Sequence, residues 1–456
     1  MKRTFIAAAV LLCTAAVVFG GPVKKRRAAP TPAAPARRAA APAARRPAPA
    51  PAAPRRAAAP AARAPVSAGY RPAGTVAFAN LDVIANAVAG IAGKGSLDPV
   101  LTKAVPAAIR NQGAARLFGP MRPGAHGVAV CYVDPAIAAR VAAAKRPSDA
   151  DLERVKRWCV VYPTAMTKAA FLARSPRERV PEADGTVKVL PGSHSRRTFW
   201  AWFSPDGKWA VLAPSASMAR HAHAAAGAAR VRPLGGDLAH VRMDAAGTRA
   251  VFGSELCAGG FLAVRMTARG LELRGSARGI AMRRPPLPPR AHALDGVPAN
   301  SPLFGVTTTP SDVQMAEDIF SKAGPEFALF VRRSLQQLQA RGSSAYYLDV
   351  PDAPPAAAPA ARLAAILPEA RAMPATANTL FCSPTTVLRT CLPKVAAKML
   401  PMDSAKLHIA LRLLRSARGD GIGCMNWREG DEDKILVRIS RDELRGTANL
   451  WSAMFL

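Results

Sequence analysis

The first 81 residues contain no aspartate or glutamate, although they hold 14 lysines and arginines. The whole chain has 456 residues, with 63 Lys and Arg against 30 Asp and Glu, which gives a formal net charge of +33. The remainder of the chain keeps 49 basic and 30 acidic residues, or +19. Both parts are therefore basic, which favours anionic partners such as nucleic acid, lipid headgroups or acidic polymers.

Sequence motifs for common chemistry are also missing. The chain has no Cys-x-x-Cys, Gly-x-Ser-x-Gly, Ser-x-x-Lys or His-Glu-x-x-His motif. Without them, zinc binding, dithiol redox chemistry and motif-bearing hydrolysis have no positive support. We therefore assign no catalytic residue, metal ligand or cofactor. Because catalytic groups are assembled in space, a hydrolase with its site in a cleft between repeats stays an alternative.

Cysteine is scarce, with seven in the chain, one of which lies in the apolar N-terminal run. The other six are an even number, which in an exported chain suggests disulfides. Cys131 and Cys159 fall in two apolar strands of one repeat, so they are the candidate pair. Buried free thiols are the alternative.

Aromatic residues make up only 6% of the chain, yet four of them lie within residues 199–203. The turn sequence Ser-Pro-Asp-Gly at 204–207 follows, so residues 198–213 predict a β-hairpin. Side chains alternate along a strand, which places Trp200 and Trp202 on one face. These two form a candidate ligand-binding face, with core packing as the alternative.

The N-terminus has the layout of a secretory signal peptide. Lys2 and Arg3 precede an apolar run, and small residues end it at Gly20, so residues 1–20 predict a cleaved signal. We expect a periplasmic or extracellular protein. The basic residues 24–27 follow at once and oppose export, so an inner-membrane anchor formed by residues 4–20 is the alternative.

Residues 21–72 consist almost wholly of Pro, Ala and Arg, which predicts a disordered, charge-extended spacer. The composition resembles that of linker-histone-type tails, which implies DNA binding, and that of envelope-protein spacers. An exported chain rarely meets chromosomal DNA, so nucleic acid is not the expected partner. The residues expected to contact an anionic envelope surface or polymer are Lys24, Lys25, Arg26, Arg27, Arg37, Arg38, Arg45, Arg46, Arg55 and Arg56.

An internal similarity organises the rest of the chain. Residues 264–277 resemble residues 437–448, with a turn two residues shorter in the second copy. Each copy predicts an amphipathic hairpin in a duplicated unit. We therefore expect an α+β fold with two related repeats of mostly antiparallel sheet and packed helices, 73–282 and 303–456, joined by a Pro-rich linker, 283–302.

Hydrophobic periodicity predicts the individual elements. The clearest predictions are strands at 127–133 and 158–162. The pattern also predicts a helix at 325–342, a strand at 362–367 and a final strand that runs to Phe455.

These observations favour an exported, non-enzymatic envelope protein that binds or scaffolds, with a basic tail attracted to anionic surfaces. One alternative is a nucleic-acid-binding protein with a histone-like tail. The other is the hydrolase with a site between the repeats.

Overall fold

The computed structural model describes most of the chain beyond residue 69. The described residues are 70–91, 102–103, 105–111, 113–143, 155–191, 198–228, 235–247, 259–278, 294–307, 335–340, 343–350, 356–372, 378–387 and 419–446. The predicted signal peptide lies outside them. So does the predicted tail, except for its last three residues, where the first strand already begins at Arg71.

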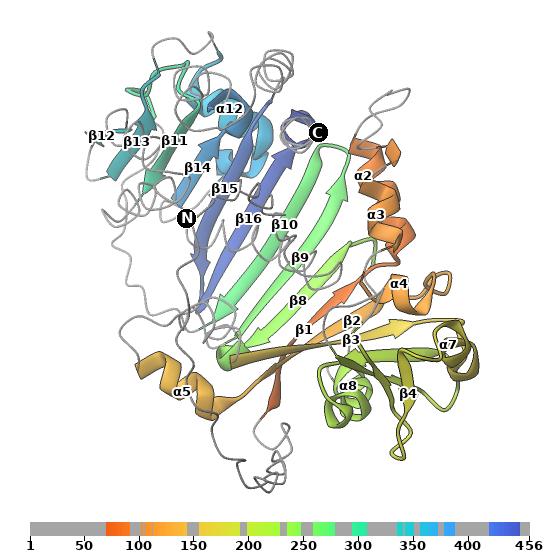
Figure 1. The fold of residues 1–456 in the computed structure, drawn as a ribbon. Coiled ribbons are helices and arrows are strands. Elements are labelled where there is room, and N and C mark those ends of the chain that lie inside the picture. The colour runs from red at the N-terminus through yellow and green to blue at the C-terminus, as the bar shows by residue number, and fades with distance from the viewer. Residues whose placement is uncertain are drawn as a thin grey trace, which may run out of the picture.

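A single sheet of sixteen strands organises the described chain (Figure 1). Every strand pairs antiparallel to its neighbours. In sheet order the strands are β12 (Leu335–Ala340), β13 (Ser343–Leu348), β11 (Leu303–Thr307), β14 (Asn378–Cys382), β15 (Ile422–Glu429), β16 (Glu432–Ser440), β10 (Gly270–Arg278), β9 (Gly259–Thr267), β8 (Ala239–Asp244), β1 (Arg71–Phe78), β2 (Gly127–Val133), β3 (Lys156–Pro163), β7 (Trp209–Ala213), β6 (Phe199–Phe203), β5 (Val187–Val189) and β4 (Arg179–Pro181).

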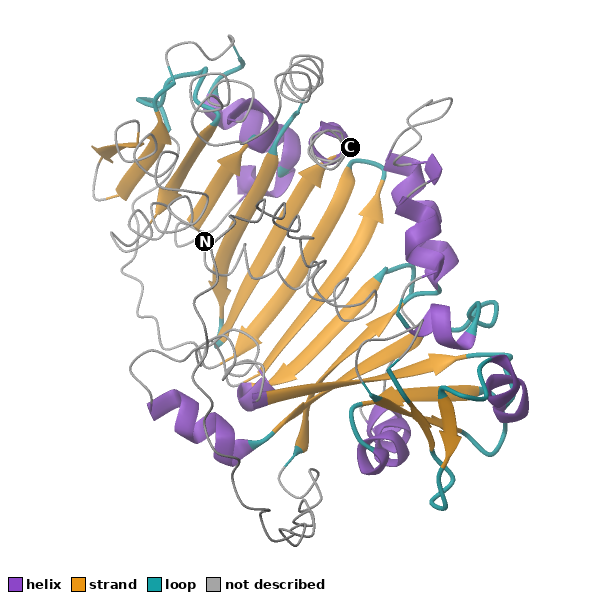
Figure 2. Ribbon diagram, viewed as in Figure 1, coloured by secondary structure: helices purple, strands orange, loops and turns teal. Residues whose placement is uncertain are grey.

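Helices pack along both faces of this sheet (Figure 2). They are α2 (Leu81–Ile91), α3 (Val105–Asn111), α4 (Ala114–Phe118), α5 (Pro135–Ala143), α7 (Lys168–Arg174), α8 (Ala216–Ala228), α12 (Pro359–Ile366) and the 3-10 helix η3 (Pro368–Ala372). Helical turns also cover residues 384–387 and 441–446. The predicted α+β class with mostly antiparallel sheet is confirmed. Among the described residues, no helix has the length and apolarity needed to cross a membrane.

The order of strands is alike on the two sides of the β10–β16 pair. Moving outward, one side runs β10, β9, β8, β1, and the other runs β16, β15, β14, β11. In each half, three consecutive strands form a meander, and the first strand of that half pairs with the meander's outer strand. The sheet counterpart of the β9–β10 hairpin is therefore the β15–β16 hairpin.

This arrangement shows that the predicted alignment of the two copies is wrong. Residues 264–277 form the end of β9, a turn and β10, whereas 437–448 begin with the end of β16 and enter a helical turn at 441. The physical reason is the sequence Ser-Arg-Asp-Glu at 440–443, which has capping-box spacing. Ser440 Oγ accepts a hydrogen bond from the Glu443 backbone N–H at 3.1 Å, so the chain starts a helix there.

Three further sequence predictions are also wrong. Residues 362–367 were expected as a strand but lie mostly in α12, where Pro359 occupies the first turn and Leu363 and Ile366 are buried on one face. The expected helix at 325–342 overlaps β12, because hydrogen-bonded pairing with β13 overrides the local helix preference. The final strand was expected to run to Phe455, but residues 441–446 are helical.

Strand register divides the sheet into two faces with different chemistry. Because side chains alternate, the pairing places α8 and α12 on the same face. The opposite face is apolar over most of its described length, and α2, α4 and α7 contribute to its cover over the first half. Between α8 and α12, the four strands β8, β9, β10 and β16 carry mostly polar side chains, which we call the polar strip. Its polar members are His240, Arg242, Arg265, Glu272, Arg274, Ser276, Lys434 and Arg438.

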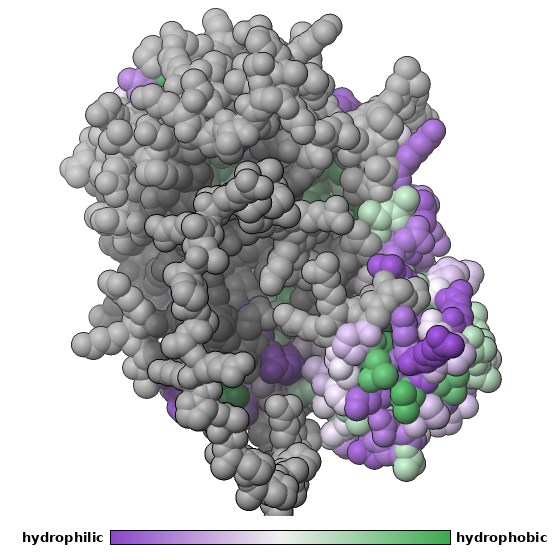
Figure 3. All heavy atoms as spheres, in the orientation of Figure 1, coloured by the Kyte–Doolittle hydropathy of each residue, from purple (hydrophilic) through white to green (hydrophobic). Residues whose placement is uncertain are grey.

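The surface around the first half is mixed in character. Figure 3 shows small hydrophobic areas among hydrophilic residues over the described part of the lower right, where α7, α8 and β4 lie in Figure 1. Such mixing is ordinary for a solvated protein surface. This surface therefore does not indicate a binding site. The candidate for a functional site is the polar strip, at its end beside α12.

Candidate functional site

The predicted aromatic face belongs to a packed core. The hairpin forms as expected, with β6 and β7 joined by the Ser204–Gly207 turn. Trp200 and Trp202 do share a face, and both pack against the apolar cluster beneath α8. The Trp202 ring lies 5.7 Å from the ring of His223 on that helix. A helix covers these tryptophans, so core packing explains them better than an open ligand face does.

The candidate disulfide is not formed. Cys131 and Cys159 are both buried free thiols in neighbouring strands. The register pairs Val130 with Cys159 and Cys131 with Trp158, so the two sulfur atoms lie on opposite faces of the sheet. Burial raises the pKa of the Cys131 thiol to about 12, which keeps it protonated and unreactive.

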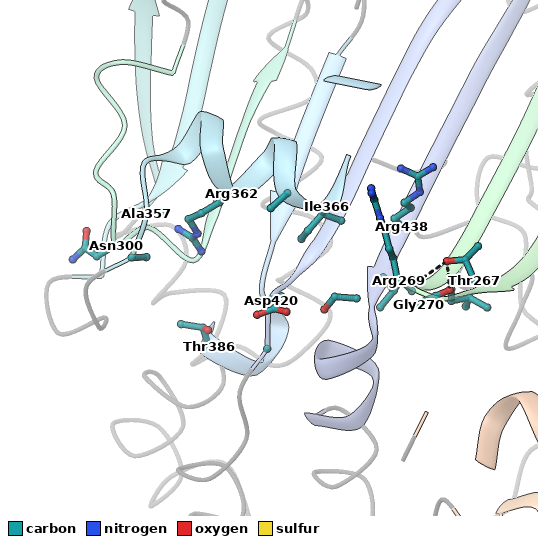
Figure 4. A pocket seen from close by; sticks show the side chains of 16 residues that line it. Thr267, Arg269, Gly270, Asn300, Ala357, Arg362, Ile366, Thr386, Asp420 and Arg438 are labelled. Carbon is teal, nitrogen blue, oxygen red and sulfur yellow. Dashed lines mark hydrogen bonds between the residues drawn. The ribbon is translucent and has the colours of Figure 1, made fainter. Parts of the chain in front are cut away.

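The basic residues predicted to contact an anionic surface, at positions 24–56, lie outside the described residues. Described basic residues instead gather at one end of the polar strip. A pocket of about 720 Å³ lies there, between the β9–β10 turn of the first half and α12 of the second (Figure 4). Its described lining residues are Thr267, Arg269, Gly270, Leu271, Asn300, Ala356, Ala357, Arg362, Ala365, Ile366, Thr386, Gly419, Asp420, Arg438, Ile439 and Ser440. One alternative from the sequence was a hydrolase with its site in a cleft between the repeats, and this pocket lies where the two halves of the sheet meet.

Arg362 projects from α12 and is held by neutral groups. Its Nη1 donates to the backbone carbonyls of Ala299 at 3.0 Å and Ser301 at 2.6 Å. The guanidinium lies 4.3 Å from the Phe381 ring centroid and 5.5 Å from that of Phe304. Burial lowers its pKa, and among the described residues no carboxylate pairs with it. Arg362 therefore keeps a positive charge that the described protein does not neutralise.

Arg269 lies at the tip of the β9–β10 hairpin. The turn is tight because Thr267 Oγ1 binds both the Arg269 N–H at 3.2 Å and the Gly270 carbonyl at 3.0 Å. The Arg269 carbonyl accepts a hydrogen bond from the Arg441 N–H, which ties the tip to the end of β16. The Arg269 side chain is exposed and, within the described chain, makes no ion pair. Its backbone is thus fixed while its charge is available.

Arg438, by contrast, is fully engaged by carboxylates. Its Nε donates to Glu272 at 2.8 Å, and its two terminal nitrogens donate to Glu369 at 2.6 Å each. Burial alone lowers the pKa of Arg438, but these hydrogen bonds outweigh it and raise the pKa. Arg438 therefore acts as a structural link between β16, β10 and η3, not as a free cation.

Asp420 is the one acidic residue among the described lining residues. In the view of Figure 4 it is seen between Arg362 on one side and Arg269 on the other. Burial raises its pKa, and the neighbouring charge of Asp442 raises it further. Asp420 is a single carboxyl against the two arginines that no carboxylate pairs with, Arg269 and Arg362, so the described charges of the pocket still favour an anion.

Sequence reasoning missed these lining residues because each comes from a distant segment. Arg269 follows a Thr-x-Arg-Gly turn, whereas Arg362 lies in an alanine-rich helix. The described lining contains neither histidine nor cysteine. Elsewhere in the described chain, the acid–histidine contact is Asp237 with His240 on the polar strip, where Arg265 binds the other carboxylate oxygen. Neither Asp237 nor His240 is among the described lining residues of the pocket.

We found no family model, no curated protein and no solved structure that matches this chain.

Proposed function

We propose that this protein is an exported, non-enzymatic binding protein of the cell envelope, and that an anionic ligand occupies the pocket between its two halves. The two halves, in this proposal, are related repeats. The basic tail holds the molecule at an anionic surface, while the folded body binds the ligand.

The carrying observation is the pair of arginines without carboxylate partners in the pocket. Charged groups are costly to remove from water unless they are paired, so a guanidinium half-buried on aromatic rings gains from an incoming anion. Arg438 does not compete for that anion, because Glu272 and Glu369 already bind it. The described charges of the pocket therefore favour an anionic ligand over a cation.

The rival functions make different demands. A hydrolase needs a nucleophile and a base within hydrogen-bond reach, and the described pocket lining supplies no histidine for that role. A nucleic-acid-binding protein needs the body inside the cell, so cell fractionation that finds the body in the cytoplasm would favour it over export.

The pocket is tested by its response to sulfate, an anion that does not titrate near neutral pH. We expect Arg362→Gln to weaken sulfate binding about tenfold or more, because a charge-assisted hydrogen bond contributes roughly 1.5–3 kcal/mol. Isothermal titration of the full mature chain at constant ionic strength measures this. Arg269→Gln, at an exposed hairpin tip, is the second variant and should weaken binding without touching the α12 packing.

Arg140→Gln in α5 is the matched control, because Arg140 is exposed and does not line the pocket. Sulfate binding that is equal in the wild type, the control and both pocket variants contradicts the proposal.

The tail is tested by its response to anionic vesicles. Residues 22–68 carry 11 lysines and arginines, and β1 begins at Arg71, so deleting 22–68 spares the sheet. We expect the full mature chain to bind phosphatidylglycerol vesicles at low salt and the deletion variant to bind far less. The reason is that each basic residue near an anionic surface contributes about 1 kcal/mol. Vesicle co-sedimentation over a salt series measures the difference.

A variant with a tail of unchanged length separates the effect of the tail's charge on vesicle binding from the effect of its length. Glutamine at the three arginine pairs of the tail keeps every Pro and Ala and also five basic residues, so we expect its vesicle binding to lie between that of the full mature chain and that of the deletion. Vesicle binding that survives both changes rules out electrostatic anchoring by the tail. The six replaced residues are Arg37, Arg38, Arg45, Arg46, Arg55 and Arg56.

A further inference from the structure

The size of the pocket sets a first limit on its ligand. Its volume of about 720 Å³ is far larger than the ~30 Å³ that one water molecule occupies in the liquid. Pockets of roughly 300–1,000 Å³ are typical of sites for organic molecules of drug size. An inorganic anion would leave most of this volume empty, so the natural ligand has a substantial organic part.

The walls of the pocket set a second limit, because they are not uniformly polar. Six described lining residues are apolar: Leu271, Ala356, Ala357, Ala365, Ile366 and Ile439. The three alanines are exposed, so they present methyl groups to water at the place where a ligand would lie. Ile366 is 7% exposed and continues that wall into the core beneath α12. The part of the ligand that touches this wall gains from being apolar.

The cations set a third limit, on the head of the ligand. The Nη1 of Arg362 is occupied by two carbonyls, and no hydrogen bond of its Nε or Nη2 is seen among the described residues. A planar guanidinium held in this way offers a fork to a carboxylate or phosphate. Arg269 supplies a second charge from the opposite wall of the pocket.

Resting on the proposed function, we infer that the ligand is an amphipathic acid: a single carboxylate or phosphate monoester joined to an aliphatic chain. The anionic head binds at Arg362, the charge of Arg269 on the opposite wall attracts it, and the chain lies on the alanine and isoleucine wall. A free fatty acid and a lipid phosphate share this chemistry.

The test compares ligands that differ in one part only. Isothermal titration of the full mature chain with decanoate, decyl phosphate, acetate and decanol separates head from chain. We expect decanoate or decyl phosphate to bind at least tenfold more tightly than acetate and decanol. Tighter decanoate indicates a fatty acid, and tighter decyl phosphate indicates a lipid phosphate.

Two exposed alanines of α12 provide a matched pair of variants. Ala365 lines the pocket and Ala360 does not, so Ala365→Asp should weaken decanoate binding at least tenfold while Ala360→Asp leaves it unchanged. Arg269→Gln should weaken decanoate and acetate alike, because it removes a positive charge that attracts the head whatever the length of the chain.

The outcomes distinguish a failure of the amphipathic ligand from a failure of the proposed anion pocket. If sulfate and acetate bind but decanoate and decyl phosphate gain nothing from the chain, the amphipathic ligand is overturned and the anion pocket stands. If Ala365→Asp leaves decanoate binding intact, the chain does not lie on α12 and the inference also fails. If no anion binds at all, the proposed function fails with it.

Discussion

Replacing Glu443 with alanine is expected to destabilise the fold by roughly 3 kcal/mol, because it leaves several buried donors without an acceptor. Glu443 is 0% exposed and its carboxylate accepts three hydrogen bonds. They come from the Thr385 N–H at 2.6 Å, the Thr385 hydroxyl at 2.6 Å and the Ser383 hydroxyl at 3.0 Å. These contacts join the turn after β16 to the turn after β14, some 60 residues earlier. Chemical denaturation with urea measures the loss.

The variant Glu443→Gln removes the charge of the side chain but keeps its shape, because the glutamine amide oxygen can still accept a hydrogen bond from Thr385. Burial raises the pKa of Glu443, although the hydrogen bonds from Thr385 and Ser383 oppose that rise. A raised pKa means that folding favours the protonated acid. This contribution to stability is complete below the unfolded pKa and is lost as pH rises through the folded pKa. The stability of the wild type relative to Glu443→Gln should therefore fall as pH rises.

The neighbouring residue is the control for this prediction. Asp442 is partly exposed and pairs only locally with Arg445, so Asp442→Ala should change stability little. A Glu443→Ala variant as stable as Asp442→Ala would show that the three hydrogen bonds do not matter.

Replacing Arg438 with alanine is expected to cost about 3 kcal/mol, the lower end for a broken buried ion pair, because Glu272 then keeps only Arg274 at 3.6 Å and Glu369, which is 40% exposed, is partly resolvated by water. The Arg438 side chain is 14% exposed and that of Glu272 is 13% exposed, so water cannot fully replace the lost partner. Arg438 also connects three segments: β16, β10 and η3. Thermal and urea denaturation of the variant measure the cost.

The effect of Arg438 should depend on pH in the opposite sense to that of Glu443. Burial acts to raise the pKa of Glu369, but the hydrogen bonds from Arg438 lower it below its usual value. A lowered pKa gives stability that is present above the unfolded pKa and is lost as pH falls through the folded pKa. The gap between wild type and Arg438→Ala should therefore narrow in acid.

Two further sets of variants serve as controls for Arg438→Ala. Arg278→Ala removes an exposed arginine from a pair with Glu432 on the same strand pairing, and should have little effect. Adding Glu272→Gln and Glu369→Gln to Arg438→Ala should recover part of the loss, because the stranded charges are then gone. If Arg438→Ala is no worse than Arg278→Ala, the buried pairing contributes nothing.

Local chemistry in the sequence was enough to predict several elements. The strand at 127–133 is found with the expected bounds, and the hairpin at 198–213 forms around its Ser-Pro-Asp-Gly turn. In both places the determinants are close together: a run of β-formers, or a Pro and a Gly at fixed turn positions. Such signals need no distant partner to be read.

Two errors arose where local signals were overlooked, and the site was missed because it depends on residues far apart in the sequence. The similarity of 264–277 and 437–448 concealed the Ser440–Glu443 cap, which turns one copy into helix. Residues 362–367 are mostly apolar, which agreed with a strand, but Pro359 and the surrounding alanines favour α12. Arg269 and Arg362 lie 93 residues apart in the printed numbering, so only the sheet topology brings them to one pocket.

The pairing of β10 with β16 has a consequence for how the chain folds during synthesis. β10 has nine residues, and in the strand order of the described sheet β16 is the partner that closes its outer edge. A growing chain that has emerged only as far as residue 278 lacks that partner, and an open edge strand is a template for self-association. A chaperone that holds the chain until its last strands emerge would therefore protect this edge more than any other part of the sheet.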